Sequence, residues 1–202
     1  MSFNNSVVVS TRHLPPEEKG SYWIQQIRQH VVNIDCPTGH QHKGFNASLR
    51  HLGCGDLKLN WIDAEAHAVH RSSSEILNSQ KQCIFMCLML DGHGFSYQGT
   101  ECVNHTPGDI VLYDTSKPYG HGFGGDMSML VVDIPRTLFE ESIAPWQHDN
   151  IVKLDRDVSI GDASSREIHR ILSRTRLEST SIQGTSELVL GQLETLLGHR
   201  TL

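Results

Sequence analysis

The sequence predicts an α+β protein in which an antiparallel β-barrel or sandwich is flanked by helices. Between Phe45 and Ile134 the apolar runs are short, and Gly, Asp, Asn or Pro interrupts them about every 8–12 residues, which is typical of antiparallel strands. Before and after this region, apolar residues recur at helical spacings. With 202 residues, of which 38% are hydrophobic, the chain can bury one core.

The amino-terminal segment is predicted to be an arm followed by a helix. Residues 1–14 show no periodicity beyond a short valine run, so we expect a flexible arm that adds at most one strand. Pro15 and Pro16 suit the first turn of a helix. One apolar stripe follows at spacings of four, four and three, formed by Trp23, Ile27, Val31 and Ile34. The segment Cys36-Pro37-Thr38-Gly39 is expected to end the helix.

The central region, near residues 40–134, is predicted to hold the strands. Residues 57–63 alternate, with Leu57, Leu59 and Trp61 on one face and Lys58, Asn60 and Ile62 on the other. The run Cys83–Leu90 is apolar on both faces, which indicates a central strand, and the Asp91–Gly94 segment is a tight-turn signal after it. A second turn at Thr106–Asp109 precedes the strand signals IVLY and MSMLVVDI. The Gly-His-Gly segments at 92–94 and 120–122 are both interpreted as turns.

After Ile134 the pattern becomes helical again. A short helix is expected to begin at Pro135, and two longer helical patterns follow it. Ile160, Ser164, Ile168, Leu172 and Thr175 share a face in the first of these, and Ile182, Val189, Leu193 and Leu196 form a stripe in the second. Leu190 and Leu197 lie beside the second stripe, so its apolar face is broader than one contact needs. We therefore expect a homodimer formed through Val189, Leu190, Leu193 and Leu197.

Composition limits the classes of partner. The formal net charge of −6 opposes binding to phosphate backbones, so this chain alone is expected to bind DNA poorly. The sequence contains no run of about 18 apolar residues that could span a bilayer and no leader pattern, which predicts a cytoplasmic protein with no membrane partner. Five cysteines without C-x-x-C spacing indicate small buried side chains rather than disulfides.

Two segments carry a resemblance to a known family. The first, GDIVLYDTSKPYGHGF over Gly108–Phe123, contains the pattern G-D-apolar-x-L-x-D-x-S-x-P. The second, LVVDIPRTLFEESI over Leu130–Ile143, contains apolar-P-R-x-L-apolar-E. Both are similar to the effector-binding half of AraC/XylS-type transcription regulators, in particular the catabolic activators. The matching residues are Gly108, Asp109, Ile110, Leu112, Asp114, Ser116 and Pro118, then Ile134, Pro135, Arg136, Leu138, Phe139 and Glu140.

This resemblance implies a specific architecture. It implies a cupin-like, jelly-roll type antiparallel barrel with an N-terminal helix and a C-terminal helical dimerisation hairpin, divided into an arm (1–14), a helix and effector-binding barrel (15–134) and a dimerisation region (135–202). DNA would be bound only through a further helix-turn-helix domain, which in the family follows the point where this sequence stops, at Leu202. A truncated regulator and a stand-alone sensor both remain open.

The expected ligand site lies inside the barrel. A sensor needs a mostly apolar cavity with a few polar groups, and the candidate ligand-binding residues are Arg50, Trp61, Tyr97, Tyr113 and His121. Arg50 is mid-strand, so it is either paired internally or placed to bind a carboxylate. The resemblance implies small aromatic acids, amines or aldehydes as effectors, and Arg50 with Trp61 would suit an aromatic acid.

Two other classes of protein compete with the sensor. Thirteen histidines raise the possibility of a metal-dependent cupin enzyme, but metal cupins share a His-x-His motif and a ligand His after Pro-x-Gly. Here the ligand His after Pro107-Gly108 is missing, because Ile110, Val111 and Leu112 stand in its place. The His40-x-His42 pair falls in a predicted loop. His67 and His70 would point to opposite faces of a strand and could not share a metal ion. No nucleophile motif is present, so we expect no catalytic residues, no metal and no cofactor. A purely structural dimerisation module with a filled barrel is the other alternative.

Overall fold

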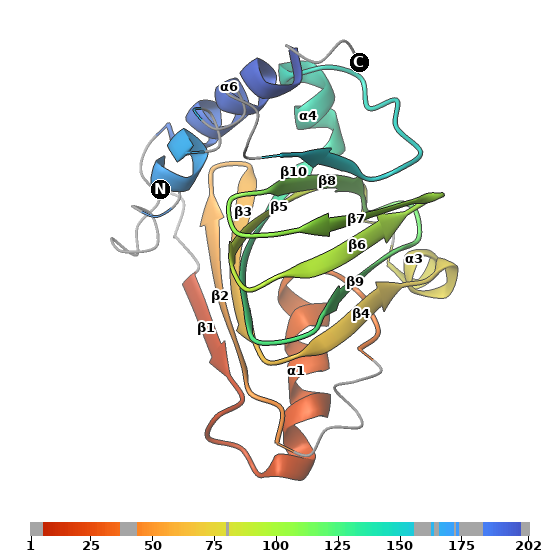
Figure 1. Cartoon of the computed structure of the whole chain (residues 1–202), viewed down its shortest axis with the longest axis vertical. Helices are drawn as coiled ribbons and strands as arrows, with labels where there is room; N and C mark the ends of the chain where they lie inside the picture. Colours follow the sequence, from red (N-terminus) through yellow and green to blue (C-terminus); the bar gives the residue numbers. More distant parts are fainter. Residues whose placement is uncertain are drawn as a thin grey trace.

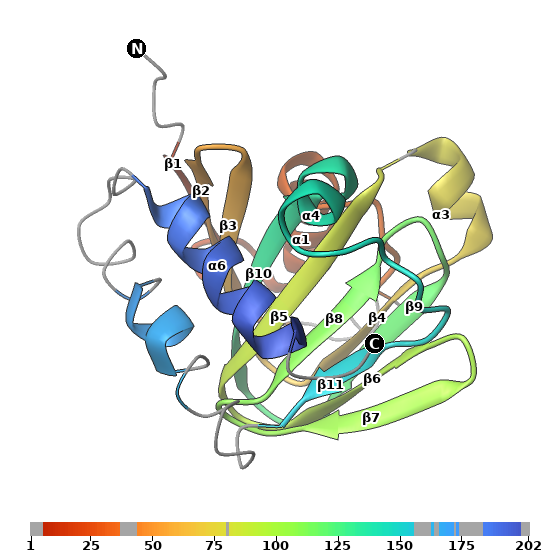
Figure 2. The same cartoon turned by 90° about the horizontal axis from the view of Figure 1, so that it is seen from above.

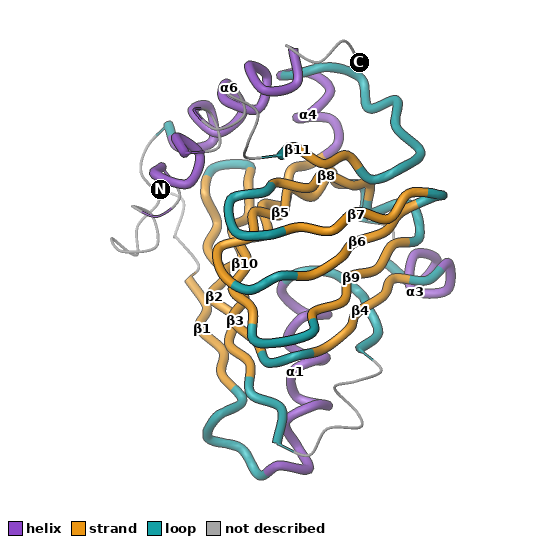
Figure 3. Tube along the Cα trace, in the orientation of Figure 1, coloured by secondary structure: helices purple, strands orange, loops and turns teal. Residues whose placement is uncertain are grey.

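The computed structural model describes residues 6–36, 44–79, 81–155, 163, 166–171, 173 and 184–198. Two antiparallel sheets lie face to face (Figures 1 and 3). The larger sheet has the strand order β1-β2-β3-β10-β5-β8-β11, and the smaller one has the order β4-β9-β6-β7. The strands are β1 (Ser6–Ser10), β2 (Ala47–Cys54), β3 (Leu57–Ala64), β4 (His67–Arg71), β5 (Cys83–Asp91), β6 (Gly94–Gln98), β7 (Glu101–His105), β8 (Ile110–Asp114), β9 (Tyr119–Phe123), β10 (Met127–Pro135) and β11 (Val152–Leu154).

Helices lie on both sides of the larger sheet. They are α1 (Pro16–His30), α3 (Ser73–Asn78), α4 (Arg136–Ser142) and α6 (Thr185–Gly198). Figures 1 and 2 show α1 at the side of the barrel where β4 and β9 lie, and α4 with α6 on the opposite side. Residues 166–171 are also helical. None of the helices within these described ranges is long and apolar enough to cross a membrane.

The larger sheet is apolar on both faces, and it therefore separates two cores. Successive residues of a strand point to opposite faces, so in β5 Phe85 and Cys87 face the smaller sheet and α1, while Ile84 and Met86 face α4 and α6. The inner core lies between the two sheets and α1. The outer core lies between the larger sheet and the carboxyl-terminal helices.

This architecture confirms the predicted fold class, an α+β protein with a cupin-like, jelly-roll type barrel. The central position of Cys83–Leu90 is confirmed, because β5 lies between β10 and β8. The sequence predicts that residues 1–14 add at most one strand. This strand is β1, which pairs with β2 over five residues. The first helix starts at Pro16 as expected but ends at His30, so Val31 and Ile34 are buried beyond its end.

The interpretation of residues 120–122 as a turn is wrong, because Gly120-His121-Gly122 is the centre of β9. Phe95 and Tyr97 of β6 lie over the two glycines. A Cβ atom on Gly120 would come within 2.5 Å of the Tyr97 ring, and one on Gly122 within 2.4 Å of the Phe95 ring. The glycines therefore make room for aromatic rings on the outer face of the smaller sheet.

The four residues expected to form a dimer contact are buried within the chain itself. Val189, Leu190, Leu193 and Leu197 are between 0% and 7% exposed, and all belong to the outer core. The broad apolar face of α6 is used against the larger sheet, which is apolar on that side too. These four side chains therefore pack within the chain, and a homodimer formed through them stays a prediction.

Some predicted features lie outside the described residues. These are the His40-x-His42 pair, Ile182, and the members Ile160, Ser164, Leu172 and Thr175 of the first carboxyl-terminal stripe. The remaining member of that stripe, Ile168, is buried in the outer core.

Candidate functional site: an apolar cavity between α1 and the barrel

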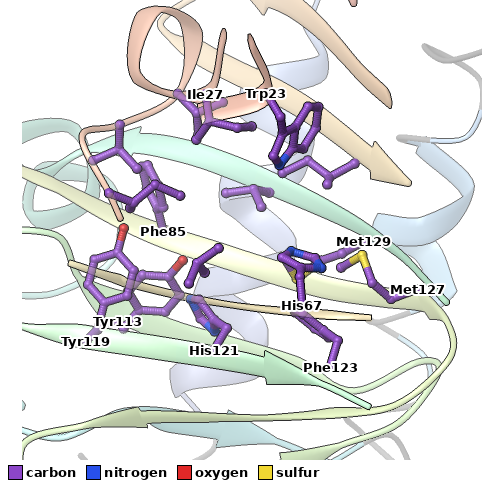
Figure 4. Close-up of a pocket in the computed structure, with 16 residues that line it drawn as sticks. Trp23, Ile27, His67, Phe85, Tyr113, Tyr119, His121, Phe123, Met127 and Met129 are labelled. Atoms are coloured by element: carbon purple, nitrogen blue, oxygen red, sulfur yellow. The ribbon is translucent and has the colours of Figure 1, made fainter. Parts of the chain in front are cut away.

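A cavity of about 50 Å³ lies in the inner core, between α1 and the barrel wall (Figure 4). Its lining is mostly aliphatic and aromatic, and the polar atoms of its side chains belong to two histidines, two tyrosines and the indole of one tryptophan. The lining residues are Trp23, Ile27, Val31, Val32, Ile34, Ile62, His67, Val69, Phe85, Tyr113, Tyr119, His121, Phe123, Met127, Met129 and Val131. This combination of apolar walls and few polar groups is typical of small-molecule sites.

Strand β9 supplies one wall of the cavity because of its alternating sequence. In Tyr119-Gly120-His121-Gly122-Phe123 the three aromatic side chains are two residues apart, so all three point inward. In the neighbouring strand β8, Tyr113 adds a fourth ring, whose centroid lies 4.5 Å from that of Tyr119 and 4.9 Å from that of His121. Figure 4 shows these rings facing Trp23 and Ile27 of α1 across the cavity.

A buried chain of hydrogen bonds holds the His121 ring. Its Nδ1 lies 2.6 Å from the Ser96 Oγ atom, and the same Oγ lies 2.8 Å from His105 Nε2. The other ring nitrogen, His121 Nε2, is buried and has no hydrogen-bond partner among the described residues. A buried polar group without a partner is unfavourable in a folded protein, so such an atom points to a functional role.

The cavity carries no formal charge at neutral pH. Lysine, arginine and carboxylate side chains are absent from the described residues that line it. Burial lowers the pKa of His121 to about 3, and burial also lowers the pKa of His67. Burial raises the pKa of Tyr113 and of Tyr119, so both phenols stay protonated. The site is therefore suited to an uncharged molecule.

Polar contacts fix α1 at both of its ends. Lys19 Nζ donates to Asn46 Oδ1 over 2.7 Å, and Asn46 Nδ2 donates to Glu65 Oε1 over 2.6 Å. At the other end, Lys81 donates to the Val31 carbonyl oxygen and pairs with Asp133 of β10. The helix thus covers the cavity as a strap that is anchored to the barrel.

The two segments with the family-like pattern meet in an ion-pair network beside the cavity. Asp114 ends β8, directly after Tyr113, and its fully buried carboxylate pairs with Arg136 at the start of α4. Arg136 Nη1 also lies 3.1 Å from Glu140 Oε1. One carboxylate oxygen of Asp114 accepts hydrogen bonds from the Ser116 backbone N–H and hydroxyl. This network connects a cavity strand to the carboxyl-terminal helices.

Of the five predicted ligand residues, the structure brings two to the cavity, Tyr113 and His121. Trp61 belongs to the outer core, on the opposite face of the larger sheet. Arg50 pairs with it across the strands, and the guanidinium carbon lies 6.0 Å from the indole centroid. Tyr97 is 41% exposed on the outer face of the smaller sheet. Arg50, Trp61 and Tyr97 therefore do not line the cavity.

The sequence patterns do not assign several of the lining residues to the site. Trp23, Ile27 and Val31 were recognised as an apolar stripe, but a stripe does not distinguish a core contact from a cavity wall. The sequence indicates His67 only as a candidate metal ligand. The alternation Tyr119-Gly-His121-Gly-Phe123 is a signal that could have identified an inward aromatic face.

Within the described ranges, no group of three or more His, Cys, Asp or Glu side chains is placed to hold a metal ion. Burial raises the pKa of the Cys87 thiol, which lies 3.4 Å from the Tyr113 hydroxyl, to about 12. A thiol with so high a pKa is a poor nucleophile at neutral pH.

Comparison with known proteins identifies the class of this domain. Residues 23–201 match the AraC-binding-like domain family, and the chain belongs to this family. Its fold resembles the crystal structure of the AraC-like transcriptional activator CuxR, with a TM-score of 0.72 and 16% identity over 95% of this chain and 70% of that one.

Two sequence relatives are similar over about 130 residues. The "Transcriptional activator NphR" of a Rhodococcus species is 26% identical over 64% of this chain and 39% of its own length. An "Uncharacterized protein in nit 5'region" of Bacillus sp. (strain OxB-1) is 25% identical over 65% of this chain and 50% of its own length. The matched region thus spans half or less of each of these relatives.

Proposed function

We propose that this domain is the sensor of an AraC-type transcription regulator and that it binds a small, uncharged, largely apolar effector in the cavity beneath α1. Membership of the AraC-binding-like family supports the regulatory role. DNA binding would belong to a part of the regulator outside this sequence, in keeping with the net charge of −6. The observation that carries the proposal is the cavity beneath α1, with its apolar walls and neutral polar groups.

The absence of charge from the cavity argues against a carboxylate effector. A buried carboxylate needs a cationic partner or several hydrogen-bond donors, because the cost of removing it from water is large. Arg50, which the sequence offered as that partner, lies on the opposite face of the larger sheet. The lining of this cavity therefore does not support the hypothesis that the effector is an aromatic acid.

Effector binding would have to change the shape of the domain. A free volume of about 50 Å³ holds roughly three to five water molecules, whereas about 150 Å³ accommodates benzene in an engineered cavity. Met127 and Met129 are flexible lining side chains that can give way. A ligand that widens the cavity favours one conformation over another, which is the condition for a ligand-driven switch.

The widening would reach the carboxyl-terminal helices through β8. Tyr113 contacts the cavity, and the next residue, Asp114, holds Arg136 of α4. Helix α4 in turn shares the outer core with α6. This route consists of contacts between neighbouring side chains, and it leads to the helices that follow the barrel in sequence.

A homodimer is the second part of the proposal. Since the inward face of α6 is buried, a second copy would meet its outward face, where Leu188 is 53% exposed. Sedimentation of the 202-residue chain, with and without effector, measures this directly. A monomeric mass at every micromolar concentration would remove the homodimer from the proposal.

The proposal is tested by calorimetric titration of the chain with toluene, phenol and benzoate. We expect the two uncharged molecules to bind and benzoate to bind at least about tenfold more weakly, because its charge is not compensated in the cavity. The substitution Val69→Phe fills the cavity and should weaken binding by about tenfold or more.

Two control variants make the test specific. Val103→Phe places the same side chain at another half-buried valine of the smaller sheet, which packs on the inner core but does not line the cavity, and it should bind normally. Arg50→Ala should also leave binding unchanged. If benzoate binds best and Arg50→Ala abolishes its binding, the effector site is not this cavity.

A further inference from the structure

Strand β1 forms an open edge of the larger sheet. It is the first strand in the order of that sheet, and it pairs with β2 on one side. Figure 1 shows β1 at the rim of the sheet, beside β2. Within the described residues, no strand pairs with its other side. Such an edge presents unpaired N–H and C=O groups to any extended chain that can reach it.

The register with β2 shows which backbone groups of β1 face the open edge. The Thr11 N–H donates to the Ala47 carbonyl oxygen over 3.0 Å, in the residue pair next to the end of β1. In an antiparallel ladder, hydrogen-bonded and non-hydrogen-bonded pairs alternate. Val7 and Val9 therefore direct their backbone groups to β2. The N–H and C=O groups that point away from β2 belong to Ser6, Val8 and Ser10.

The sequence of β1 suits pairing with a second copy of itself. Its five residues, Ser-Val-Val-Val-Ser, are the same in both directions. An antiparallel pair with a two-fold axis at Val8 would place Val8 opposite Val8, and serine opposite serine at both ends. In this register each outward N–H group meets an outward C=O group. No charged side chain lies on β1, so pairing brings no like charges opposite each other, although the chain has a net charge of −6.

The other three edges of the two sheets are protected in ways that β1 is not. Strand β11 has only three residues, and its Lys153 pairs with Asp109. Strand β7 carries an exposed charge at Glu101. Along β4, the backbone of Asp35 exchanges hydrogen bonds with that of His70 and covers part of the edge. Short strands, charges and covering segments prevent pairing between sheet edges. Within the described residues, β1 has five uncharged residues and no covering segment.

The Val8 side chain adds apolar surface at the same edge. It is 73% exposed, although valine is among the residues most often buried. It lies opposite Arg50 of β2, on the face of the larger sheet that belongs to the outer core. Helix α6 begins close by, because a Cβ atom on Gly55, in the β2–β3 turn, would lie 2.9 Å from the Ser186 Oγ atom. A second copy at this edge would cover Val8 and remove it from water.

We infer that two copies of the chain associate through antiparallel pairing of their β1 strands about a two-fold axis at Val8, which joins the two larger sheets into one. The inference rests on the homodimer of the proposed function and assigns it an interface. A pair of five-residue strands is a small interface, so we expect a dissociation constant on the order of 10 μM.

The test is sedimentation of the 202-residue chain over a range of micromolar concentrations, with charges placed at the axis. Val8→Lys and Val8→Glu each set two like charges opposite each other, so each should weaken association at least about tenfold. An equimolar mixture of the two variants should restore the dimer, because opposite charges then meet. The matched control, Val8→Thr, keeps an uncharged β-branched side chain and should dimerise normally.

Hydrogen exchange gives a second readout, which follows single amides. The Val8 N–H should be protected at concentrations above the dissociation constant and should exchange rapidly below it. The Val9 N–H points to β2 and should be protected at both concentrations, which shows that β1 stays in place. A Val8 N–H that is protected in the monomer would mean that another segment of the same chain covers the edge, and this would overturn the inference.

The variants also separate this inference from the proposed homodimer. If Val8→Lys dimerises as the unsubstituted chain does, the inference is overturned. Loss of that dimer in Leu188→Lys would then place the contact on the outward face of α6, and the proposed homodimer would stand. A monomeric mass of the unsubstituted chain at every concentration would remove the homodimer and this inference together.

Discussion

At the scale of single residues, Gly92 is a position where the backbone excludes every other side chain. It has a φ of +79°, and a Cβ atom there would lie 2.4 Å from the Asp126 carbonyl oxygen, in the neighbouring β9–β10 turn. Both strain and overlap with backbone are therefore expected from Gly92→Ala, which should lower the free energy of unfolding by about 2–4 kcal/mol. Urea denaturation measures the change.

The matched control for this prediction is Gly124→Ala. A Cβ atom on Gly124 meets nothing within 4 Å, and its φ does not lie in the left-handed region. We expect a change of less than about 0.5 kcal/mol. If the two alanine variants unfold at the same urea concentration, the two turns do not approach each other as described.

Residue patterns predicted where the strands lie, but they did not predict which face of each strand points into the barrel. The period of two in Leu57–Asp63 is confirmed in β3, but Trp61 faces the outer core and Ile62 the cavity side. Because the larger sheet is apolar on both faces, alternation alone does not indicate which face is the interior of the barrel. Tyr97 shows the same difficulty, since a ring over a glycine on an outer face resembles an inward aromatic.

At the scale of elements, the junction between β8 and α4 is held by the Asp114–Arg136 pair. The Asp114 carboxylate is fully buried, whereas Arg136 is 25% exposed. Arg136→Met would leave a buried carboxylate with only its Ser116 contacts, so we expect the free energy of unfolding to fall by about 2–4 kcal/mol. Thermal and urea unfolding measure this loss.

Glu140→Gln provides the control for the junction. Glu140 is 36% exposed and contacts the same arginine over 3.1 Å, so its loss should cost less than about 1 kcal/mol. An Arg136→Met variant as stable as the Glu140→Gln variant would show that the buried pair does not hold the two elements together. Asp114→Asn combined with Arg136→Met should recover part of the stability, since no buried charge then remains.

The elements also show why the role of a helix is harder to predict than its existence. The stripe Trp23, Ile27 and Val31 predicted a helix with one buried face, and α1 confirms it. Its position over a cavity depends on Lys19 and Lys81, whose partners are distant in sequence. In the same way, the apolar width of α6 indicated a contact, but the sequence did not show that the contact is the larger sheet of the same chain.

At the scale of the whole molecule, a single sheet separates the cavity from the carboxyl-terminal helices. One face of β8 and β10 lines the cavity through Tyr113, Met129 and Val131, and the opposite face carries α4 and α6. Protein interiors are close-packed, so side chains displaced on one face of such a sheet shift those on the other. In the proposed sensor, this two-core arrangement would carry a change of cavity volume to α4 and α6, in addition to the route through Asp114 and Arg136.

The whole molecule should lose stability as the pH falls below about 6.5, because several of its histidines are buried in the neutral form. Burial lowers the pKa of His67 and of His105, and it lowers the pKa of His121 to about 3. The unfolded chain, with histidine pKa values near 6.5, then binds more protons than the folded one. The stabilisation is complete above pH 6.5 and is lost as the pH falls toward the folded-state pKa values.

Each fully buried histidine should account for about 1 kcal/mol of stability between pH 7 and 5.5. Urea unfolding at pH 7.0, 6.0 and 5.5 measures the slope, which His121→Phe should flatten and His93→Phe should not. A free energy of unfolding that stays constant over this range would mean that these histidines bind protons in the folded state as readily as in the unfolded chain.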